Sequence, residues 1–218
     1  MRILMLRHGQ TPSNVQGLLD TGAPGPGLTR LGQSQAEAVP QALADREVDA
    51  VVVSSLTRTS LTAAPLLRQR GLESLMLPGL AEIEAGDLEM AGDEASQRTY
   101  IETAFAWSSG QLQRSMPGGT DGRAFFSRFD QAIAEVAASG WRSVVVVSHG
   151  AAIRTWSRSR IQGPDVEARS QHQFANTGAV EMEGDPSSGW RLLDWINDPI
   201  GGGKLASEIA EDPTGEPV

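Results

Sequence analysis

The chain has 218 residues, of which 39% are hydrophobic and 21% are charged, as expected for a single globular domain. Its formal net charge of −9 argues against a nucleic-acid or anionic-membrane surface, because such surfaces need a basic footprint, but a small anion still fits a locally positive pocket. The lack of cysteine excludes disulfides, thiolate catalysis and cysteine-bound metals. The first apolar run is too short for a signal peptide or a membrane span, so we expect a cytoplasmic protein.

Strand-like and helix-like segments alternate through the first part of the chain. Short apolar runs bounded by polar or glycine residues predict buried strands, and apolar residues at helical spacing predict helices. In chain order we expect a strand at Ile3–Leu6, a glycine-rich loop at 15–27, a helix at Gly32–Asp45 capped by Thr29, a strand at Ala50–Val53, a helix at Leu56–Arg70 and a strand at Leu75–Leu77. This alternation is typical of an α/β fold.

Residues 83–119 interrupt the alternation with glycines on both sides of one expected helix, Glu94–Ser108. An insertion of this kind is commonly a lid or a specificity segment, although surface elaboration is an alternative. If it is a lid, specificity should depend on its bulky and basic side chains, Tyr100, Phe105, Trp107, Arg114 and Met116. Packing against the main domain explains each aromatic ring equally well.

The remaining segments complete one domain, which we place at residues 1–197. We expect a helix at Asp121–Ala138 with an apolar core stripe, a strand at Val144–Val147, a helix at Ala151–Ser159 and closing strands at Ala179–Glu183 and Arg191–Ile196. From Asp198 onward the chain is rich in glycine, proline and acidic residues and has no apolar period. Residues 198–218 are therefore predicted to form a mobile tail.

One short internal similarity points to chemistry. A histidine–glycine pair follows an apolar strand and one polar residue at His8 and again at His149. If the two strands are parallel neighbours, both imidazoles emerge at one carboxyl edge of the sheet, where Gly9 lets a ligand approach the backbone and helix N-termini favour anions. Arg7 and Arg58 add guanidinium groups, which suit the oxygens of phosphate. The sequence therefore predicts a phosphoryl site.

Two other interpretations compete with this one. A histidine at a strand end is commonly a structural residue, but two in matched contexts with arginines nearby favour a site. A metal site is less favoured, because three histidines and no cysteines supply neither a helical histidine pair nor a compact ligand cluster. We therefore predict no metal and no cofactor. His172 lies in a polar run and is interpreted as a bystander.

In combination these motifs resemble the histidine phosphatase superfamily, also called the phosphoglycerate mutase-like family, over residues 2–197. The similar blocks are Arg7-His8-Gly9 with Thr11 and Asn14, Leu28-Thr29 with Gly32 and Gln35-Ala36, Ser54-Ser55-Leu56 with Arg58, Leu80-Ala81-Glu82 with Gly86 and Glu89, and Val147-Ser148-His149-Gly150 with Arg154. The resemblance implies a three-layer α/β/α sandwich with a mostly parallel central sheet and a lid insertion at about residues 83–119.

The resemblance also implies a role for each site residue. His8 would be the nucleophile, Glu82 the general acid and base, and Arg7, Asn14, Arg58, His149 and the Gly150 backbone N–H the phosphate-binding groups. Attack by His8 on phosphorus would give a phosphohistidine, which water would then hydrolyse. Glu84 and Glu89 are the competing carboxylates, and the motif favours Glu82.

The expected function is hydrolysis of a small phosphate monoester by a metal-independent phosphatase of the histidine acid phosphatase type. Phosphoglycerate mutase-type transfer is an alternative, although the insertion has only the scattered Arg98 and Arg114 to hold a second acidic group. A non-catalytic phosphate-binding module is another. The expected partner is a small phosphorylated metabolite, with no nucleic acid and no membrane, and the oligomeric state is not predicted.

Overall fold

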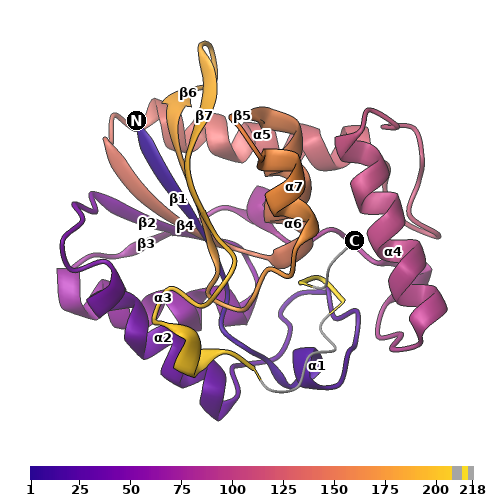
Figure 1. Ribbon diagram of the computed structural model, residues 1–218, viewed down its shortest axis with the longest axis horizontal. Helices are drawn as coiled ribbons and strands as arrows, with labels where there is room; N and C mark the ends of the chain where they lie inside the picture. The colour runs from indigo at the N-terminus through magenta and orange to yellow at the C-terminus, as the bar shows by residue number, and fades with distance from the viewer. Residues whose placement is uncertain (208–212, 216–218) are drawn as a thin grey trace.

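The strands lie side by side in one mixed sheet. Within residues 1–207 and 213–215, which the computed structural model describes, seven strands run in the order β3-β2-β4-β1-β6-β7-β5 (Figure 1). They are β1 (Arg2–Arg7), β2 (Ala50–Val53), β3 (Ser74–Met76), β4 (Ser143–Ser148), β5 (Ile161–Gln162), β6 (Ala179–Asp185) and β7 (Gly189–Ile196). β6 pairs antiparallel with β1 and β7, and the other pairs are parallel, so the sheet is mostly parallel as predicted.

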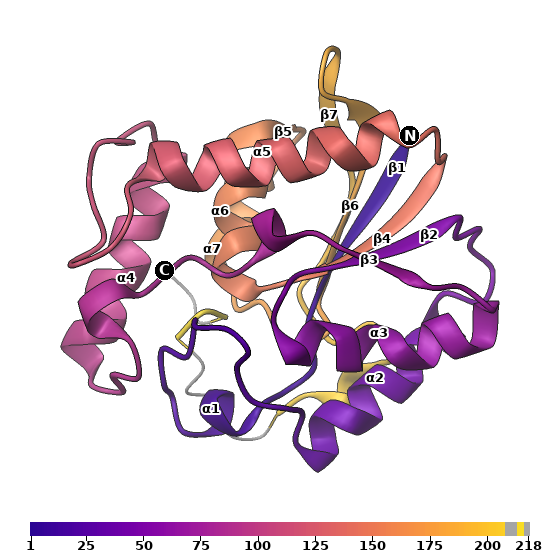
Figure 2. The same ribbon diagram turned by 180° about the vertical axis from the view of Figure 1, so that it is seen from behind.

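Helices cover both faces of this sheet. They are α1 (Pro12–Val15), α2 (Arg30–Ala42), α3 (Thr57–Arg70), α4 (Glu94–Ser108), α5 (Gly122–Ala138), α6 (Gly150–Arg160) and α7 (Val166–Gln171), with the 3-10 helices η1 (Pro78–Leu80), η2 (Gly86–Leu88) and η3 (Gly203–Leu205). Figure 2 shows the sheet between α2 and α3 on one side and α5 and α6 on the other. The predicted three-layer arrangement is confirmed.

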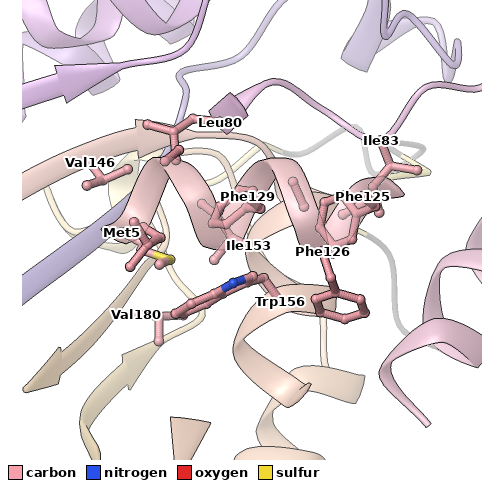
Figure 3. Packing of buried hydrophobic residues seen from close by; sticks show 14 of the residues in the cluster. Met5, Leu80, Ile83, Phe125, Phe126, Phe129, Val146, Ile153, Trp156 and Val180 are labelled. Atoms are coloured by element: carbon pink, nitrogen blue, oxygen red, sulfur yellow. The ribbon is translucent and has the colours of Figure 1, made fainter. Parts of the chain in front are cut away.

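Alternating side chains along the central strands produce these layers. On β1, Met5 joins the core on the α5 and α6 face, whereas Leu6 joins the core on the α2 and α3 face. Figure 3 shows Met5 and Val180 of neighbouring strands beside Ile153 and Trp156 of α6. Because both faces are buried, the central strands are continuous apolar runs, which is why the sequence identified them.

The predicted elements are present, with ends shifted by a few residues. α2 begins at Arg30 because Thr29 accepts the Gly32 N–H at 3.0 Å, and α4 has the predicted bounds. The elements that were not predicted are α1, β5, α7 and the 3-10 helices η1, η2 and η3. β5 has only two residues and therefore carries no pattern, and α7 starts after Asp165, whose backbone is left-handed with φ 63°.

Residues 83–119 lie beside the sheet, and their helix α4 stands beyond α6 (Figure 1). Four of the five side chains proposed for specificity, Tyr100, Phe105, Trp107 and Met116, are buried in the core that α5 and α6 share, whereas Arg114 is exposed. Tyr100 Oη donates to Ile83 O at 2.8 Å, and Trp107 Nε1 donates to Arg114 O at 2.6 Å. The packing interpretation is therefore correct for these four side chains.

The segment after Asp198 makes specific contacts with the domain over its described residues. Gln35 Nε2 donates to Leu205 O at 2.9 Å, and the Phe174 N–H donates to Gly215 O at 2.7 Å. Thr214 is buried. The polar composition that predicted a mobile tail gave no sign of these contacts. The same prediction covers residues 208–212 and 216–218, which lie outside the described residues.

Candidate active site

The two histidine–glycine pairs leave the sheet together at the carboxyl ends of β1 and β4. These strands are parallel neighbours with Arg7 opposite Ser148, and the His8 N–H donates to Ser148 O at 3.0 Å. The rings of His8 and His149 meet edge to face, with their centroids 5.2 Å apart. The prediction that both imidazoles share one edge of the sheet is confirmed.

The His8 ring has one nitrogen bound to the backbone. Nδ1 lies 2.8 Å from Gly9 O, and a carbonyl oxygen only accepts, so in the neutral ring Nδ1 carries the proton and Nε2 has the lone pair. Burial, together with the charges of Arg58 and Arg7, holds the pKa of His8 well below its ordinary value of 6.5. His8 is therefore neutral near pH 7, with Nε2 in the state that a nucleophile needs.

Two buried guanidinium groups flank the histidines. Arg58, in the first turn of α3, donates from Nη2 to Asp20 O at 2.9 Å. Arg7 donates from Nη1 to Phe174 O and from Nη2 to Thr214 Oγ1, the latter at 2.9 Å. Both charges lower the pKa values of the two histidines, so the site is locally positive in a chain of net charge −9.

Glu82 is buried against the first turn of α6. Its carboxylate accepts the N–H groups of Ala151 at 3.2 Å and Ala152 at 2.8 Å, and that of Ile83 at 2.8 Å. Burial is the largest influence and raises the pKa of Glu82 above its ordinary value of 4.5, while the three N–H donors and Arg58 oppose the rise. A carboxyl group with a raised pKa keeps its proton to a higher pH, as a general acid must.

The two competing carboxylates are placed differently. Glu84 is exposed to solvent. Glu89 accepts the N–H groups of Thr21 at 2.8 Å and Gly22 at 3.0 Å, and also the Thr21 hydroxyl, so it ties the loop after α1 to residues 83–119. The geometry therefore favours Glu82 over both for the proton-transfer role.

The N-terminus of α6 does attract an anion, but that anion is the side chain of Glu82. The N–H groups of Ala151 and Ala152 are engaged by its carboxylate. The phosphate contact predicted from the sequence is the backbone N–H of Gly150, which precedes them in this turn. A Cβ atom at Gly150 would lie 2.7 Å from Thr214 O and 3.0 Å from Arg7 Nε. Glycine is thus required for the close approach of these groups.

Asn14 is held through its amide oxygen by Thr11 and Asn176. Its Oδ1 accepts from the Thr11 N–H at 2.9 Å, from Thr11 Oγ1 at 3.0 Å and from Asn176 Nδ2 at 3.3 Å. Within the described residues Nδ2 has no partner, so it is left as a donor for a ligand, which suits the predicted phosphate contact.

Gly9 has a packing role that the sequence did not indicate. A Cβ atom there would lie 2.6 Å from Gly32 O, so the open side of Gly9 faces α2. The expectation that this glycine makes room for a ligand is wrong, because helix α2 occupies that side.

Three of the residues that contact the site, Ser54, Arg128 and Thr214, were given no role by sequence reasoning, although Ser54 lies in one of the similar blocks. Ser54 Oγ lies 2.7 Å from His149 Nε2, and Arg128 of α5 donates to Glu82 O at 2.7 Å. The third is Thr214, which contacts Arg7 as described above. Ser54 directly follows β2 at the same edge of the sheet, and this position was the available signal. Arg128 and Thr214 lie in segments with no chemical motif.

Two further findings concern the described residues alone. None of their histidine, aspartate and glutamate side chains gather in a group of three or more that could hold a metal ion. Among the helices in residues 1–207 and 213–215, none is both long and apolar enough to cross a membrane.

His172 is exposed, in keeping with its interpretation as a bystander.

Comparisons with known proteins agree with this site. The family model of the histidine phosphatase superfamily (branch 1) matches residues 3–198. The chain belongs to this superfamily, as its motifs predicted.

The relatives include named phosphatases. The adenosylcobalamin/alpha-ribazole phosphatase of Escherichia coli is 33% identical over 151 residues, which are 68% of this chain and 73% of that protein. The PE-PGRS family protein PE_PGRS11 of Mycobacterium tuberculosis is 37% identical over 223 residues, which are 95% of this chain but only 38% of that protein. The structure of mycobacterial glucosyl-3-phosphoglycerate phosphatase complexed with VO3 is similar with a TM-score of 0.73 and 29% identity, covering 90% of this chain and 98% of that chain.

Proposed function

We propose that this protein is a phosphatase that hydrolyses a small phosphate monoester through a phosphohistidine on His8. The observation that carries the proposal is a buried, neutral His8 with its Nε2 lone pair available, placed among two guanidinium groups. Membership of the histidine phosphatase superfamily and the phosphatase names of several relatives support it.

In the first step, His8 Nε2 attacks phosphorus and the ester P–O bond breaks. Arg7, Arg58 and His149 bind the phosphoryl oxygens, because a loose transition state spreads charge over them and the protein's main task is to position and stabilise that charge. The Glu82 carboxyl group donates its proton to the leaving oxygen, so the alcohol departs neutral.

In the second step, the Glu82 carboxylate removes a proton from water while the water oxygen attacks phosphorus. The P–N bond breaks, its electron pair returns to His8 Nε2, and phosphate leaves. The hydrogen bond from His8 Nδ1 to Gly9 O is present throughout and keeps Nε2 directed at phosphorus. No step requires a metal ion.

Two variants and a substrate panel test the proposal. His8→Ala should abolish hydrolysis of an aryl phosphate, while a chelator should leave the wild-type rate unchanged. His172→Ala is the matched control, because His172 is the third histidine and is exposed, and it should retain the wild-type rate. Full activity of His8→Ala would refute the mechanism. Faster transfer between phosphoglycerate isomers than hydrolysis would favour the mutase alternative.

The cytoplasmic location, the domain at residues 1–197 and the tail at 198–218 remain proposals from the sequence. The substrate class is proposed only as a small phosphorylated metabolite, in line with the named phosphatase relatives.

A further inference from the structure

A hydrogen bond from Ser54 orients the ring of His149. Ser54 directly follows β2 and is fully buried, and its Oγ lies 2.7 Å from His149 Nε2. His149 is the N-cap residue of α6, but its side chain makes no capping bond, because the carboxylate of Glu82 accepts the N–H groups of that turn. The imidazole is therefore held from the side, by Ser54.

The distances around Ser54 show where its hydroxyl proton lies. Its Oγ is 2.7 Å from His149 Nε2 but 3.2 Å from Thr59 Oγ1, and O–H hydrogen bonds normally span about 2.5–3.0 Å. Thr59 has a better acceptor for its own proton in Leu56 O, at 2.8 Å. The Ser54 proton is therefore directed at Nε2.

A second contact strengthens Ser54 as a donor. The Leu56 N–H donates to Ser54 Oγ at 3.2 Å, and a hydroxyl group that accepts a hydrogen bond is polarised to donate a stronger one. The chain of donors thus runs from the Leu56 backbone through Ser54 to His149 Nε2. A ring nitrogen that accepts carries no proton, so the proton of neutral His149 lies on Nδ1.

His149 Nδ1 is a buried donor in need of an acceptor. Among the described residues it has no hydrogen-bond partner, and the ring is fully buried. Burial and the neighbouring positive charges hold the pKa of His149 well below its ordinary value of 6.5, so the ring is neutral. Buried polar groups normally find partners, and an unpaired one beside Arg58 and His8 points to an anionic ligand.

We propose that Ser54 is a positioning residue, whose hydroxyl group holds His149 in the Nδ1–H tautomer so that Nδ1–H donates to an oxygen of the phosphoryl group on its way to and from His8. This inference rests on the proposed function for the identity of the ligand. The other tautomer would present a lone pair to an anion and repel it. Ser54 thereby makes an uncharged imidazole a phosphate-binding donor.

The tautomer is measured directly by nitrogen-15 NMR of the wild-type protein without substrate. The chain has three histidines, and His8 serves as an internal reference because its Nδ1–H is fixed by Gly9 O. We expect His149 Nδ1 to be protonated and Nε2 unprotonated near neutral pH. A protonated Nε2 with a bare Nδ1 would overturn the proposal, whether or not the protein is a phosphatase.

The kinetic test compares Ser54→Ala with Ser55→Ala. We expect Ser54→Ala to lower kcat on an aryl phosphate by about tenfold or more with little change in KM, because a donor to the transition state is no longer held in place. Ser55→Ala is the same change one residue further on, at a side chain that forms no hydrogen bond in the described part of the chain, and it should keep the wild-type kcat.

Folding and tautomer measurements separate positioning from a merely structural role. Thermal unfolding checks that Ser54→Ala is folded, since the variant also removes the acceptor of the Leu56 N–H. Ser54→Thr keeps a hydroxyl group and should restore kcat and the Nδ1–H signal. Equal kcat for Ser54→Ala and Ser55→Ala, or a lower kcat with an unchanged His149 tautomer, would overturn the proposal. An inactive wild type would refute the proposed function, and the NMR result would still decide the tautomer.

Discussion

Replacing Glu82 by glutamine removes the proposed proton donor and leaves the shape of the side chain unchanged. General acid catalysis is worth about 100-fold to 10,000-fold, so kcat on an alkyl phosphate should fall by that order. An aryl phosphate has a leaving group that needs little protonation, so the rate constant of phosphohistidine formation from it should fall much less. The ratio of the two losses reports the role of Glu82 more directly than either rate alone.

The same substitution has a stability effect that follows from three hydrogen bonds. Oε1 of Glu82 accepts the N–H groups of Ile83 and Ala152, both at 2.8 Å, and a glutamine oxygen can keep these bonds. Oε2 accepts the Ala151 N–H at 3.2 Å, and the amide nitrogen of glutamine cannot. One buried donor is left unpaired, which costs about 1–3 kcal/mol of unfolding free energy.

This cost should depend on pH in a defined direction. The pKa of Glu82 is raised in the folded protein above its ordinary value of 4.5, so the folded state binds this proton more tightly than the unfolded state. The resulting stability is fully present below pH 4.5 and is lost as the pH rises through the folded pKa. The wild-type protein loses this contribution to its unfolding free energy as the pH rises, whereas Glu82→Gln has no such contribution to lose. The difference in unfolding free energy between the two proteins should therefore narrow as the pH rises.

Rapid-mixing kinetics on one alkyl and one aryl phosphate, with urea unfolding at two pH values, measure these effects. Glu84→Gln is the matched control, because it is the same change two residues away at an exposed position, and it should match wild type in both assays. Equal losses in the rate of phosphohistidine formation from the two esters would refute the role of Glu82 as proton donor. A stability gap that widens as the pH rises would refute the raised pKa.

Three further predictions test the site and the fold. As the pH rises, kcat/KM should increase through the lowered pKa of His8 and decrease through the raised pKa of Glu82. Glu82→Gln should lose the decrease at higher pH. A wild-type profile without that decrease would contradict the prediction. Thr214→Val removes the hydroxyl group that competes with phosphate for Arg7 Nη2, so inorganic phosphate should inhibit up to about tenfold more strongly. Weaker inhibition would instead place Thr214 among the phosphate ligands. Phe129→Ala, in the core beside Trp156, should lower the unfolding free energy by about 3–5 kcal/mol, against less than about 0.5 kcal/mol for the exposed Arg123→Ala, as measured by urea unfolding.

The sequence predicted the sheet and the position of the histidines because those features are local. Central strands that are buried on both faces are continuous apolar runs, so the order of apolar residues in the sequence was enough to predict β1, β2 and β4. Parallel strands end at one edge of the sheet, and this rule was enough to predict that His8 and His149 lie together. Helix caps such as Thr29 were equally readable, because one side chain and one N–H three residues later define them.

Contacts between distant segments were not predictable in the same way. Arg128 reaches the backbone of Glu82 from 46 residues away, and Thr214 reaches Arg7 across 207 residues. Neither pair leaves a pattern in the chain, because the partners depend on how α5 and the C-terminal segment pack. The aromatic rings of residues 83–119 show the same limit: their composition suited a binding surface as well as a core, and only packing decided for the core.

The first turn of α6 links the buried carboxyl group of Glu82 to the helix whose N-cap residue is His149. A helix N-terminus favours an anion, and the Glu82 carboxylate occupies that position. The His149 side chain therefore makes no capping hydrogen bond to α6. Ser54, which directly follows the neighbouring strand β2, then orients the ring through its hydrogen bond to Nε2. Because the N–H groups of this turn bind the Glu82 carboxylate and its backbone begins at His149, a change in the start of α6 should move both groups together. Loss of proton donation and loss of phosphate binding are therefore expected to occur in the same variants of this turn.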